Sequence, residues 1–239
     1  MSETAGWLLD GRLRYRQLAT GHRTGIEPVL LAASIPARDG ETVIEAGTGA
    51  GAGLLCLAAR LPGISGLGVE RETRLAALAQ RNFAANDLPN LTAIAADLAA
   101  LPLQRRFDHG FANPPWRSPH DTPSPDTIRR RAHHSTAGLL ATWAQAIAAV
   151  LKPRGTMTFI LPATSLDECL GAMKQAGCGA PRIMPLWPRT DRAAKLVIVR
   201  STRGDRGSLT LLPGLTLHDD NGYTPRAEAI LRGGESLTF

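Results

Sequence analysis

The sequence predicts an α/β fold in which a mostly parallel sheet carries helices on both faces. From residue 42 onward, short apolar runs alternate with longer segments whose apolar residues recur at helical spacing. This alternation is typical of parallel strands joined by helical crossovers. The chain has 239 residues, 44% of them hydrophobic, which is enough to bury a large core without disulfides or a structural metal.

The expected elements follow one another without a long linker or an internal repeat. Seven strands are expected, at residues 42–46, 66–69, 91–95, 108–112, 156–161, 182–186 and 195–200. Helices are expected at residues 26–34, 51–61, 72–86, 137–151, 165–176 and 225–231. Between them, the polar and proline-interrupted stretch 117–134 predicts a long loop. Residues 1–39 form an N-terminal segment, and residues 40–239 form one domain that includes a C-terminal extension.

Local signals support the helix boundaries. Pro28 falls in the first turn of the helix at 26–34, where its missing N–H costs no hydrogen bond. The pair Pro62-Gly63 ends the helix at 51–61. In the segment 72–86, apolar residues at positions 75, 78, 79 and 83 line one helical face.

Composition excludes several classes of protein. The three cysteines, Cys56, Cys169 and Cys178, are too few and too scattered for a disulfide framework or a zinc site, so no metal is expected. No apolar segment approaches the roughly 18–20 residues that span a bilayer, and the N-terminus lacks the basic and apolar regions of a signal peptide. We therefore expect a reduced, cytoplasmic protein. The net charge of +6 fits a polyanionic partner such as nucleic acid, although an arginine- and alanine-rich composition alone would also give it.

A glycine-rich loop follows the first predicted strand of the domain. Glu45 precedes Gly47, Thr48, Gly49 and Gly51, and such glycines let the backbone approach a ligand closely. The spacing also satisfies the dinucleotide pattern G-x-G-x-x-G/A. An acidic residue at the start of the loop would repel a pyrophosphate, whereas it suits the cationic aminoacid-sulfonium group of S-adenosylmethionine (SAM). The charge therefore favours SAM as the cofactor.

Two further acids stand at strand ends. Glu70 closes the apolar strand at 66–69, where a carboxylate can accept hydrogen bonds from the two ribose hydroxyls of the cofactor. Asp97, followed by Leu98, lies near the end of the next strand and can accept the amino group of the cofactor's adenine. An N-cap role for Asp97 is the alternative. Tyr15 and Arg23 are expected at the cofactor entrance.

The tetrapeptide Asn113-Pro114-Pro115-Trp116 follows the fourth strand of the domain. Two consecutive prolines fix the backbone and supply no N–H groups, so they present the carbonyls of Asn113 and Pro114 beside an aromatic face. This arrangement is a receptor for a planar –NH2 group. Trp116 is expected to stack on a base that has been flipped out of its stack.

Arg129, Arg130 and Arg131 form the densest basic cluster in the chain. They come shortly after the Asn-Pro-Pro-Trp turn, where a substrate strand would pass, and backbone phosphates are their natural target. A solvated helix start without a partner is the alternative.

These motifs together resemble one family. The segment from Gly21 to Ser34, the glycine loop, Glu70, Asp97 and the Asn-Pro-Pro-Trp turn are similar to the bacterial tRNA adenine-N6 methyltransferases that modify the anticodon-adjacent adenosine of a valine tRNA. These are Asn-Pro-Pro-aromatic, SAM-dependent enzymes, and the aromatic residue is more often tyrosine or phenylalanine than tryptophan.

The resemblance implies a seven-stranded, Rossmann-like methyltransferase fold with an antiparallel last strand and an N-terminal segment over the cofactor site. It also implies an enzyme that methylates the N6 amine of adenine in RNA, with tRNA as the expected substrate, acting as a monomer or weak homodimer. Three alternatives stay open. They are guanine-N2 methylation of RNA, methylation of a protein glutamine amide, and an RNA-binding module without turnover.

Overall fold

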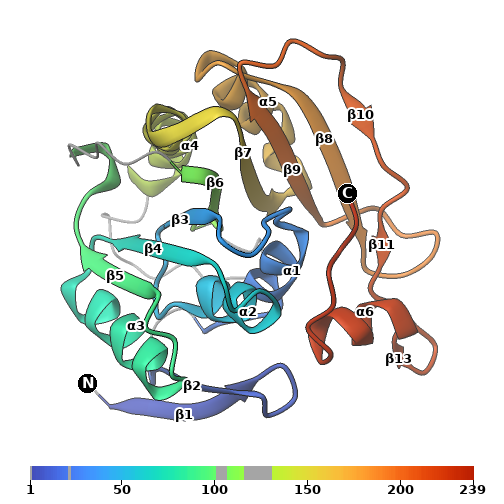
Figure 1. Cartoon of the computed structure of the whole chain (residues 1–239). Coiled ribbons are helices and arrows are strands. Elements are labelled where there is room, and N and C mark those ends of the chain that lie inside the picture. Colours follow the sequence, from blue (N-terminus) through green and yellow to red (C-terminus); the bar gives the residue numbers. More distant parts are fainter. Residues whose placement is uncertain (1, 21–22, 101–106, 116–130) are drawn as a thin grey trace.

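The computed structural model describes residues 2–20, 23–100, 107–115 and 131–239 (Figure 1). The predicted α/β fold is confirmed. The main sheet contains the seven expected strands in the order β8-β9-β7-β6-β3-β4-β5. In chain order these are β3 (Thr42–Ala46), β4 (Ser65–Glu70), β5 (Leu91–Ala95), β6 (Phe107–Ala112), β7 (Leu151–Pro162), β8 (Cys178–Trp187) and β9 (Leu196–Arg203). All are parallel except β9, the last of the seven, which is antiparallel to both β7 and β8.

Two short strands widen this sheet to nine. Strands β10 (Thr210–Leu211) and β11 (Leu215–Thr216) pair in parallel with β8 along its outer edge. Two-residue pairings of this kind leave no period in the sequence, so seven strands were expected in this sheet, whereas the described residues form nine. The C-terminal extension thus lies along the edge of the sheet (Figure 1). It also contains the hairpin β12 (His218–Asp219) and β13 (Gly222–Tyr223).

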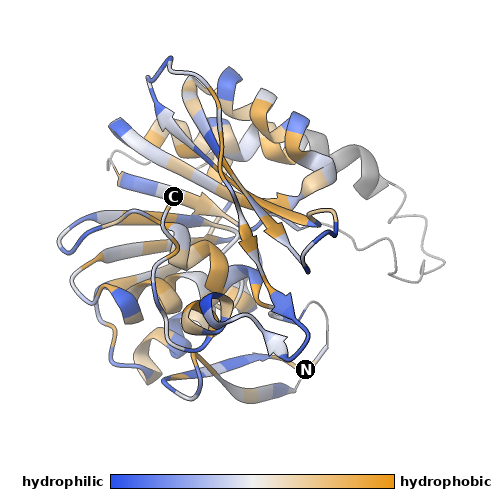
Figure 2. Cartoon of the chain, turned by 90° about the vertical axis from the view of Figure 1, so that its right-hand side faces the viewer, coloured by the Kyte–Doolittle hydropathy of each residue, from blue (hydrophilic) through white to orange (hydrophobic). Residues whose placement is uncertain are grey.

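The helices cover both faces of the sheet, and each face has its own hydrophobic cluster. One cluster includes residues of α1 (Glu27–Ser34), α2 (Ala52–Arg60), α3 (Thr73–Ala85) and α6 (Pro225–Leu231). The other includes α4 (Arg131–Val150), α5 (Leu166–Gln175) and the short helix η1 (Leu98–Ala100). A second short helix, η3 (Ala163–Ser165), precedes α5. Figure 2 shows hydrophobic residues concentrated in the central strands and helices, with hydrophilic residues toward the loops.

One boundary differs clearly from the prediction. The helix expected at 137–151 spans Arg131–Val150, and the strand expected at 156–161 already begins at Leu151. Leu151 pairs with Phe107, after which the register shifts before His109 pairs with Thr156. The prediction assigned residues 152–155 to neither element, but an irregular pairing carries the strand through them.

The N-terminal segment contains a hairpin that the sequence did not predict. Strands β1 (Glu3–Leu8) and β2 (Leu13–Leu18) pair antiparallel, and β2 packs against α3 (Figure 1). Asn82 and Asn86, one turn apart on α3, each exchange two hydrogen bonds with the backbone of β2. Asn82 pairs in this way with Arg16, and Asn86 with Arg14. The two side-chain amides thus take the place of a third strand and fix the hairpin to the domain.

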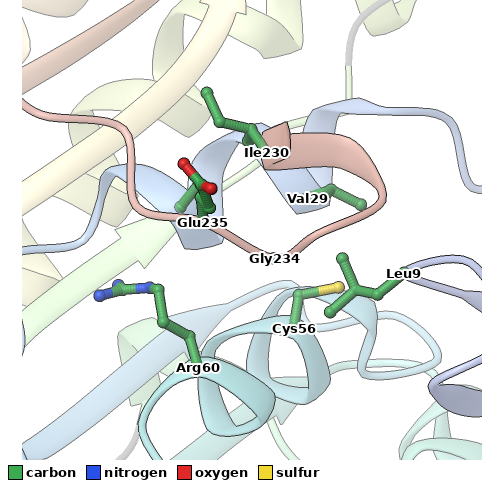
Figure 3. A pocket seen from close by; sticks show the side chains of 8 residues that line it. Leu9, Val29, Cys56, Arg60, Ile230, Gly234 and Glu235 are labelled. Atoms are coloured by element: carbon green, nitrogen blue, oxygen red, sulfur yellow. The ribbon is translucent and has the colours of Figure 1, made fainter. Parts of the chain in front are cut away.

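The C-terminal segment closes over the α1 and α2 side of the domain. The backbone N–H of Leu237 donates to the carbonyl of Ala33 at 2.8 Å, and α6 contacts α1. A small pocket, partly open to solvent, remains between these parts (Figure 3). It is lined by Leu9, Val29, Ala33, Cys56, Arg60, Ile230, Gly234 and Glu235, none of which is a predicted site residue.

Candidate active site

The strand order of the sheet reverses between β3 and β6. From β3 the chain builds β4 and β5 on one side, and then returns to place β6 and β7 on the other. Ala46 and Ala112, the last residues of β3 and β6, are paired neighbours. The glycine loop follows Ala46, and the Asn113 turn follows Ala112. In open α/β sheets, ligands bind at such a reversal of strand order.

The glycine loop has a backbone that favours glycine at three alternate positions. Gly47, Gly49 and Gly51 have φ angles of 64°, 56° and 88°, and Gly51 is the N-cap of α2. The N–H groups of Gly47 and Thr48 donate to the carbonyl of Val69 at 2.8 and 3.2 Å. The loop is therefore held against the end of β4 and leads directly into a helix N-terminus.

Glu45 lies beneath this loop, with only 4% of its surface exposed. Its carboxylate accepts a hydrogen bond from the Thr48 hydroxyl at 2.5 Å and another from the backbone N–H of Leu54 in the first turn of α2. Burial raises the pKa of Glu45 to about 8, and the nearby charge of Glu70 contributes in the same direction. A buried carboxyl group with this pKa is poised to ionise when a cation binds beside it.

Glu70 joins the end of β4 to the glycine loop. One carboxylate oxygen accepts from the backbone N–H of Gly49 at 3.0 Å, and the other accepts from that of Glu72 at 2.9 Å. Each oxygen keeps further acceptor capacity, because a carboxylate has about four lone-pair sites. Glu70 is partly exposed, so it lies where the sequence predicted, at the strand end beside the loop.

Asp97 and Leu98 follow β5 at the same edge of the sheet. The Asp97 carboxylate accepts from the backbone N–H of Ala99 at 3.0 Å, which is the N-cap geometry considered as its alternative role. Its side chain is exposed, whereas Leu98 is buried in η1. The cap and a ligand contact are compatible, because the second carboxylate oxygen has no partner among the described residues.

Tyr15 and Arg23 take different positions. Tyr15 is buried on β2, and its hydroxyl is 2.7 Å from the Thr24 hydroxyl oxygen. Burial raises the pKa of Tyr15 to about 12, and the charge of Glu45 adds to the effect, so Tyr15 lies close to the acid beneath the loop. Arg23 is exposed. Arg23 directly precedes Thr24, the residue that contacts Tyr15.

The Asn113 turn presents an unpaired acceptor. The Oδ1 atom of Asn113 is buried, and among the described residues nothing donates a hydrogen bond to it. Pro114 is buried and Pro115 is exposed. A buried acceptor left unpaired costs roughly 1–3 kcal/mol, so this oxygen is suited to a donor that comes from a ligand. Trp116, Arg129 and Arg130 lie outside the described residues, and of Arg131 only its place at the start of α4 is described.

Three contributors to the site were not predicted. Gly53 packs directly under the Glu45 carboxylate, where a β-carbon would overlap it. The indole of Trp143, on α4, lies over Gly47, so that a β-carbon at Gly47 would come within 2.5 Å of its Cη2 atom. Asn82 also donates to the carbonyl of Ala50 in the loop at 2.9 Å. The sequence predicts only that these residues lie in helices, and not which residues of the loop or strand they contact.

The described part of the chain contains no group of three or more His, Cys, Asp or Glu side chains that could hold a metal ion. The same residues contain no helix long and apolar enough to cross a membrane.

Comparison with known proteins supports a methyltransferase fold and domain. The model of the methyltransferase small domain matches residues 26–142, just under half of the chain and including the glycine loop, Glu70, Asp97 and Asn113. A protein from Dickeya chrysanthemi named tRNA1(Val) (adenine(37)-N6)-methyltransferase is 25% identical, with 94% of each chain covered. One of the same name from Shewanella sediminis is 28% identical over 62% of this chain, and the match spans 63% of that relative's length.

Solved structures of low identity share the fold. A predicted O-methyltransferase from Agrobacterium tumefaciens superposes with a TM-score of 0.74 at 22% identity, covering 89% of this chain and 99% of the other. A T. thermophilus 16S rRNA N2 G1207 methyltransferase, in complex with AdoMet and guanosine, superposes with a TM-score of 0.60 at 19% identity. That match covers 84% of this chain and 50% of the other.

Proposed function

We propose that this chain, a member of the methyltransferase small-domain family through residues 26–142, transfers a methyl group from SAM to the N6 amine of adenine in RNA, with tRNA as its substrate. The observation that carries the proposal is the buried Oδ1 of Asn113, an acceptor without a donor among the described residues. It stands at the strand end that neighbours the glycine loop. The names of the sequence relatives support adenine and tRNA as the targets.

The residues around the loop fit SAM. The loop from Gly47 to Gly51 and the carboxylates of Glu45, Glu70 and Asp97 would hold it, with Leu98, Tyr15 and Arg23 around them. The chemistry of this donor set agrees with a cationic ligand, since a buried carboxyl group with a pKa of about 8 gains a favourable partner when a positive charge arrives. When bound, SAM supplies a methyl group attached to positively charged sulfur.

Asn113 and Pro114 act on the amine. The lone pair of an aromatic amine is delocalised into its ring, so the nitrogen is a weak nucleophile. The Asn113 Oδ1 and the Pro114 carbonyl accept hydrogen bonds from its two N–H groups and orient the nitrogen toward the loop. As positive charge develops on the nitrogen, both hydrogen bonds strengthen, which stabilises the transition state more than the ground state. The methylated nitrogen is strongly acidic and loses its proton to water, so no general base is needed.

The substrate contacts of the proposal fall largely outside the described residues. Trp116 follows Pro115 and would stack on the flipped adenine, a contact worth about 1–3 kcal/mol per base. Arg129, Arg130 and Arg131 would neutralise backbone phosphates beside it. Acting on tRNA, the protein would work in the cytoplasm, as a monomer or weak homodimer.

The experiment is a nucleoside assay. The purified protein is incubated with SAM and an unmodified valine tRNA transcript, and the digested RNA is examined by mass spectrometry for N6-methyladenosine. Asn113→Ala should reduce turnover by roughly 10²–10³-fold while the affinity for SAM stays the same. Asn90→Ala, an exposed asparagine ahead of β5, is the matched control and should keep full activity.

Other outcomes separate the alternatives. N2-methylguanosine in the digest would show that guanine, and not adenine, is the target base. Methyl transfer to a peptide glutamine amide, and not to RNA, would point to a protein substrate. SAM binding without transfer to either would leave a binding module. An Asn113→Ala variant with unchanged turnover would remove Asn113 from the mechanism.

A further inference from the structure

We infer that the outer face of the N-terminal hairpin is a docking surface for the RNA substrate. The hairpin face is defined by Ala5, Trp7, Arg14 and Arg16. This inference rests on the proposed function in one respect only, namely that the partner is RNA. It adds to that proposal the place where the body of the RNA is held.

The strand register puts these four side chains on one surface. Trp7 is paired with Arg14, and Ala5 is paired with Arg16, so the two pairs project from the same face of the hairpin. Leu13 and Tyr15 alternate with the arginines and are buried against the domain. The opposite face, with Trp7 and Arg14, therefore points to solvent.

Trp7 is unusual in its exposure. Among the described residues it is one of three large hydrophobic side chains that are markedly exposed, and 62% of its surface is accessible. A solvated indole beside two guanidinium groups combines the two contacts that single-stranded RNA segments use, a flat π-surface for a base and cations for phosphates.

The charges around the hairpin favour an anion. The structure shows no carboxylate partner for Arg14 among the described residues, and the Arg16 side chain is 62% exposed. Glu3 is the acidic group on the same face. It pairs with Arg81 of α3 at 2.5 Å and lies 3.9 Å from Arg16, so it is already neutralised.

A basic path leads from the hairpin toward the candidate site. Arg74 is exposed in the first turn of α3, and Arg71 is exposed just after β4. Arg81, two turns further along α3, is exposed but paired with Glu3. The N-terminus of α3 lies at the carboxyl edge of the sheet, where β4 ends at Glu70. Acidic Glu72 interrupts the path at that end. An RNA that contacts the hairpin can thus follow arginines along α3 to the edge that holds the glycine loop.

The hairpin is rigid enough to serve as a fixed contact. Asn82 and Asn86 hold its inner strand by four hydrogen bonds of 2.7–3.0 Å. Arg12, in the turn, donates to the carbonyl of Gly233 at 2.5 Å. A surface that is already ordered loses little entropy when it binds.

The test measures binding of a fluorescent tRNA transcript by anisotropy at several salt concentrations. Trp7→Ala should weaken binding roughly five- to tenfold, the lower range of a stacking contribution, and Trp7→Phe should restore most of it. Arg14→Ala should reduce the slope of log K against log salt by roughly 0.7–0.9, as expected for one lost phosphate contact.

The controls lie elsewhere on the surface. Leu211→Ala removes an equally exposed apolar side chain on β10, and Arg206→Ala removes an exposed arginine at the opposite, amino edge of the sheet. Both should bind RNA like the unaltered protein. All variants should keep their SAM affinity and thermal midpoint, because the hairpin face contacts neither the loop nor the core. In methylation assays, the hairpin variants should raise KM for RNA while kcat is retained.

The outcomes distinguish this inference from the proposed function. If the unaltered protein forms N6-methyladenosine and the hairpin variants bind RNA with unchanged affinity and salt slope, the hairpin inference is wrong and the proposed function stands. If RNA binding depends on Trp7 and Arg14 but no methylated adenine forms, the docking surface stands and the proposed function is wrong. If Trp7→Ala abolishes self-association and leaves RNA binding intact, the face joins two copies of the chain, which overturns the inference.

Discussion

The buried carboxyl group of Glu45 should make the stability of the free protein depend on pH. Burial raises its pKa from 4.5 to about 8. Between these two values the folded protein keeps a proton that the unfolded chain has lost. Stability falls with rising pH wherever the folded state binds more protons, so the free energy of unfolding should decrease from about pH 5 to about pH 8.

The size of the effect follows from the two pKa values. Linkage between a folded pKa of about 8 and an unfolded pKa of 4.5 gives a loss of about 3 kcal/mol between pH 5 and pH 8. Glu45→Gln removes the titration. Its amide oxygen can still accept from the Leu54 N–H, and its –NH2 group can donate to the Thr48 hydroxyl. The variant should therefore gain stability over the unaltered protein as the pH rises.

Urea unfolding followed by circular dichroism, without SAM, measures this at about pH 5, 6, 7 and 8. Other titrating groups are common to both proteins, so the difference between their unfolding free energies isolates Glu45. That difference should grow by about 3 kcal/mol across the range. Glu72→Gln, which neutralises an exposed acid, should show no such growth. Parallel curves for the unaltered protein and Glu45→Gln would refute the reasoning.

Three further predictions concern the same framework. SAM binding at pH 7 should release close to one proton as Glu45 ionises, measured by titration calorimetry in buffers of different ionisation enthalpy; heats that are independent of buffer would contradict it. Gly53→Ala should destabilise the protein by about 1–3 kcal/mol through overpacking against Glu45, whereas Gly171→Ala, a helical glycine with open space around it, should be neutral or stabilising in the same urea assay. Burial lowers the pKa of His109 below 6.5 despite its contact with Glu41. The unfolded chain then binds the proton more readily than the folded protein, so stability should be lost as the pH falls below 6.5. His109→Gln should lose less stability in the same urea assay, and an equal loss in both proteins would count against this assignment.

The sequence predicted the central elements well, because their signals are local. Strands β3 and β5 begin and end at the expected residues, and helix α6 matches the expected 225–231. The two strands combine an apolar run with turn residues nearby, and α6 begins at Thr224-Pro225 and ends before Gly233. Buried parallel strands require such runs.

The N-terminal hairpin was missed for a physical reason. Most residues of β1 are exposed, so the strand carries no alternation of apolar and polar residues. Its pairing partner and the asparagines of α3 hold it in place, and the asparagines are more than 60 positions away along the chain. Local sequence cannot report such a contact.

For the candidate site, the sequence predicted where the residues lie on the main chain, but not which side chains contact one another. The glycine loop, Glu70, Asp97 and Asn113 all stand at the carboxyl edge, as expected from strand ends. The burial of Glu45 over Gly53 and the indole of Trp143 over Gly47 depend on how helices α2 and α4 pack. Periodicity gives the existence of those helices but not which of their side chains meet the loop.

Asn82 has a consequence for how the two ligands influence each other. Its amide nitrogen is 2.9 Å from both the carbonyl of Ala50, in the loop, and the carbonyl of Arg16, in the hairpin. If binding of the methyl donor rearranges the glycine loop, this amide would transmit the change to the hairpin face that we propose binds RNA. Thermodynamic reciprocity then requires that each ligand change the affinity of the other by the same factor.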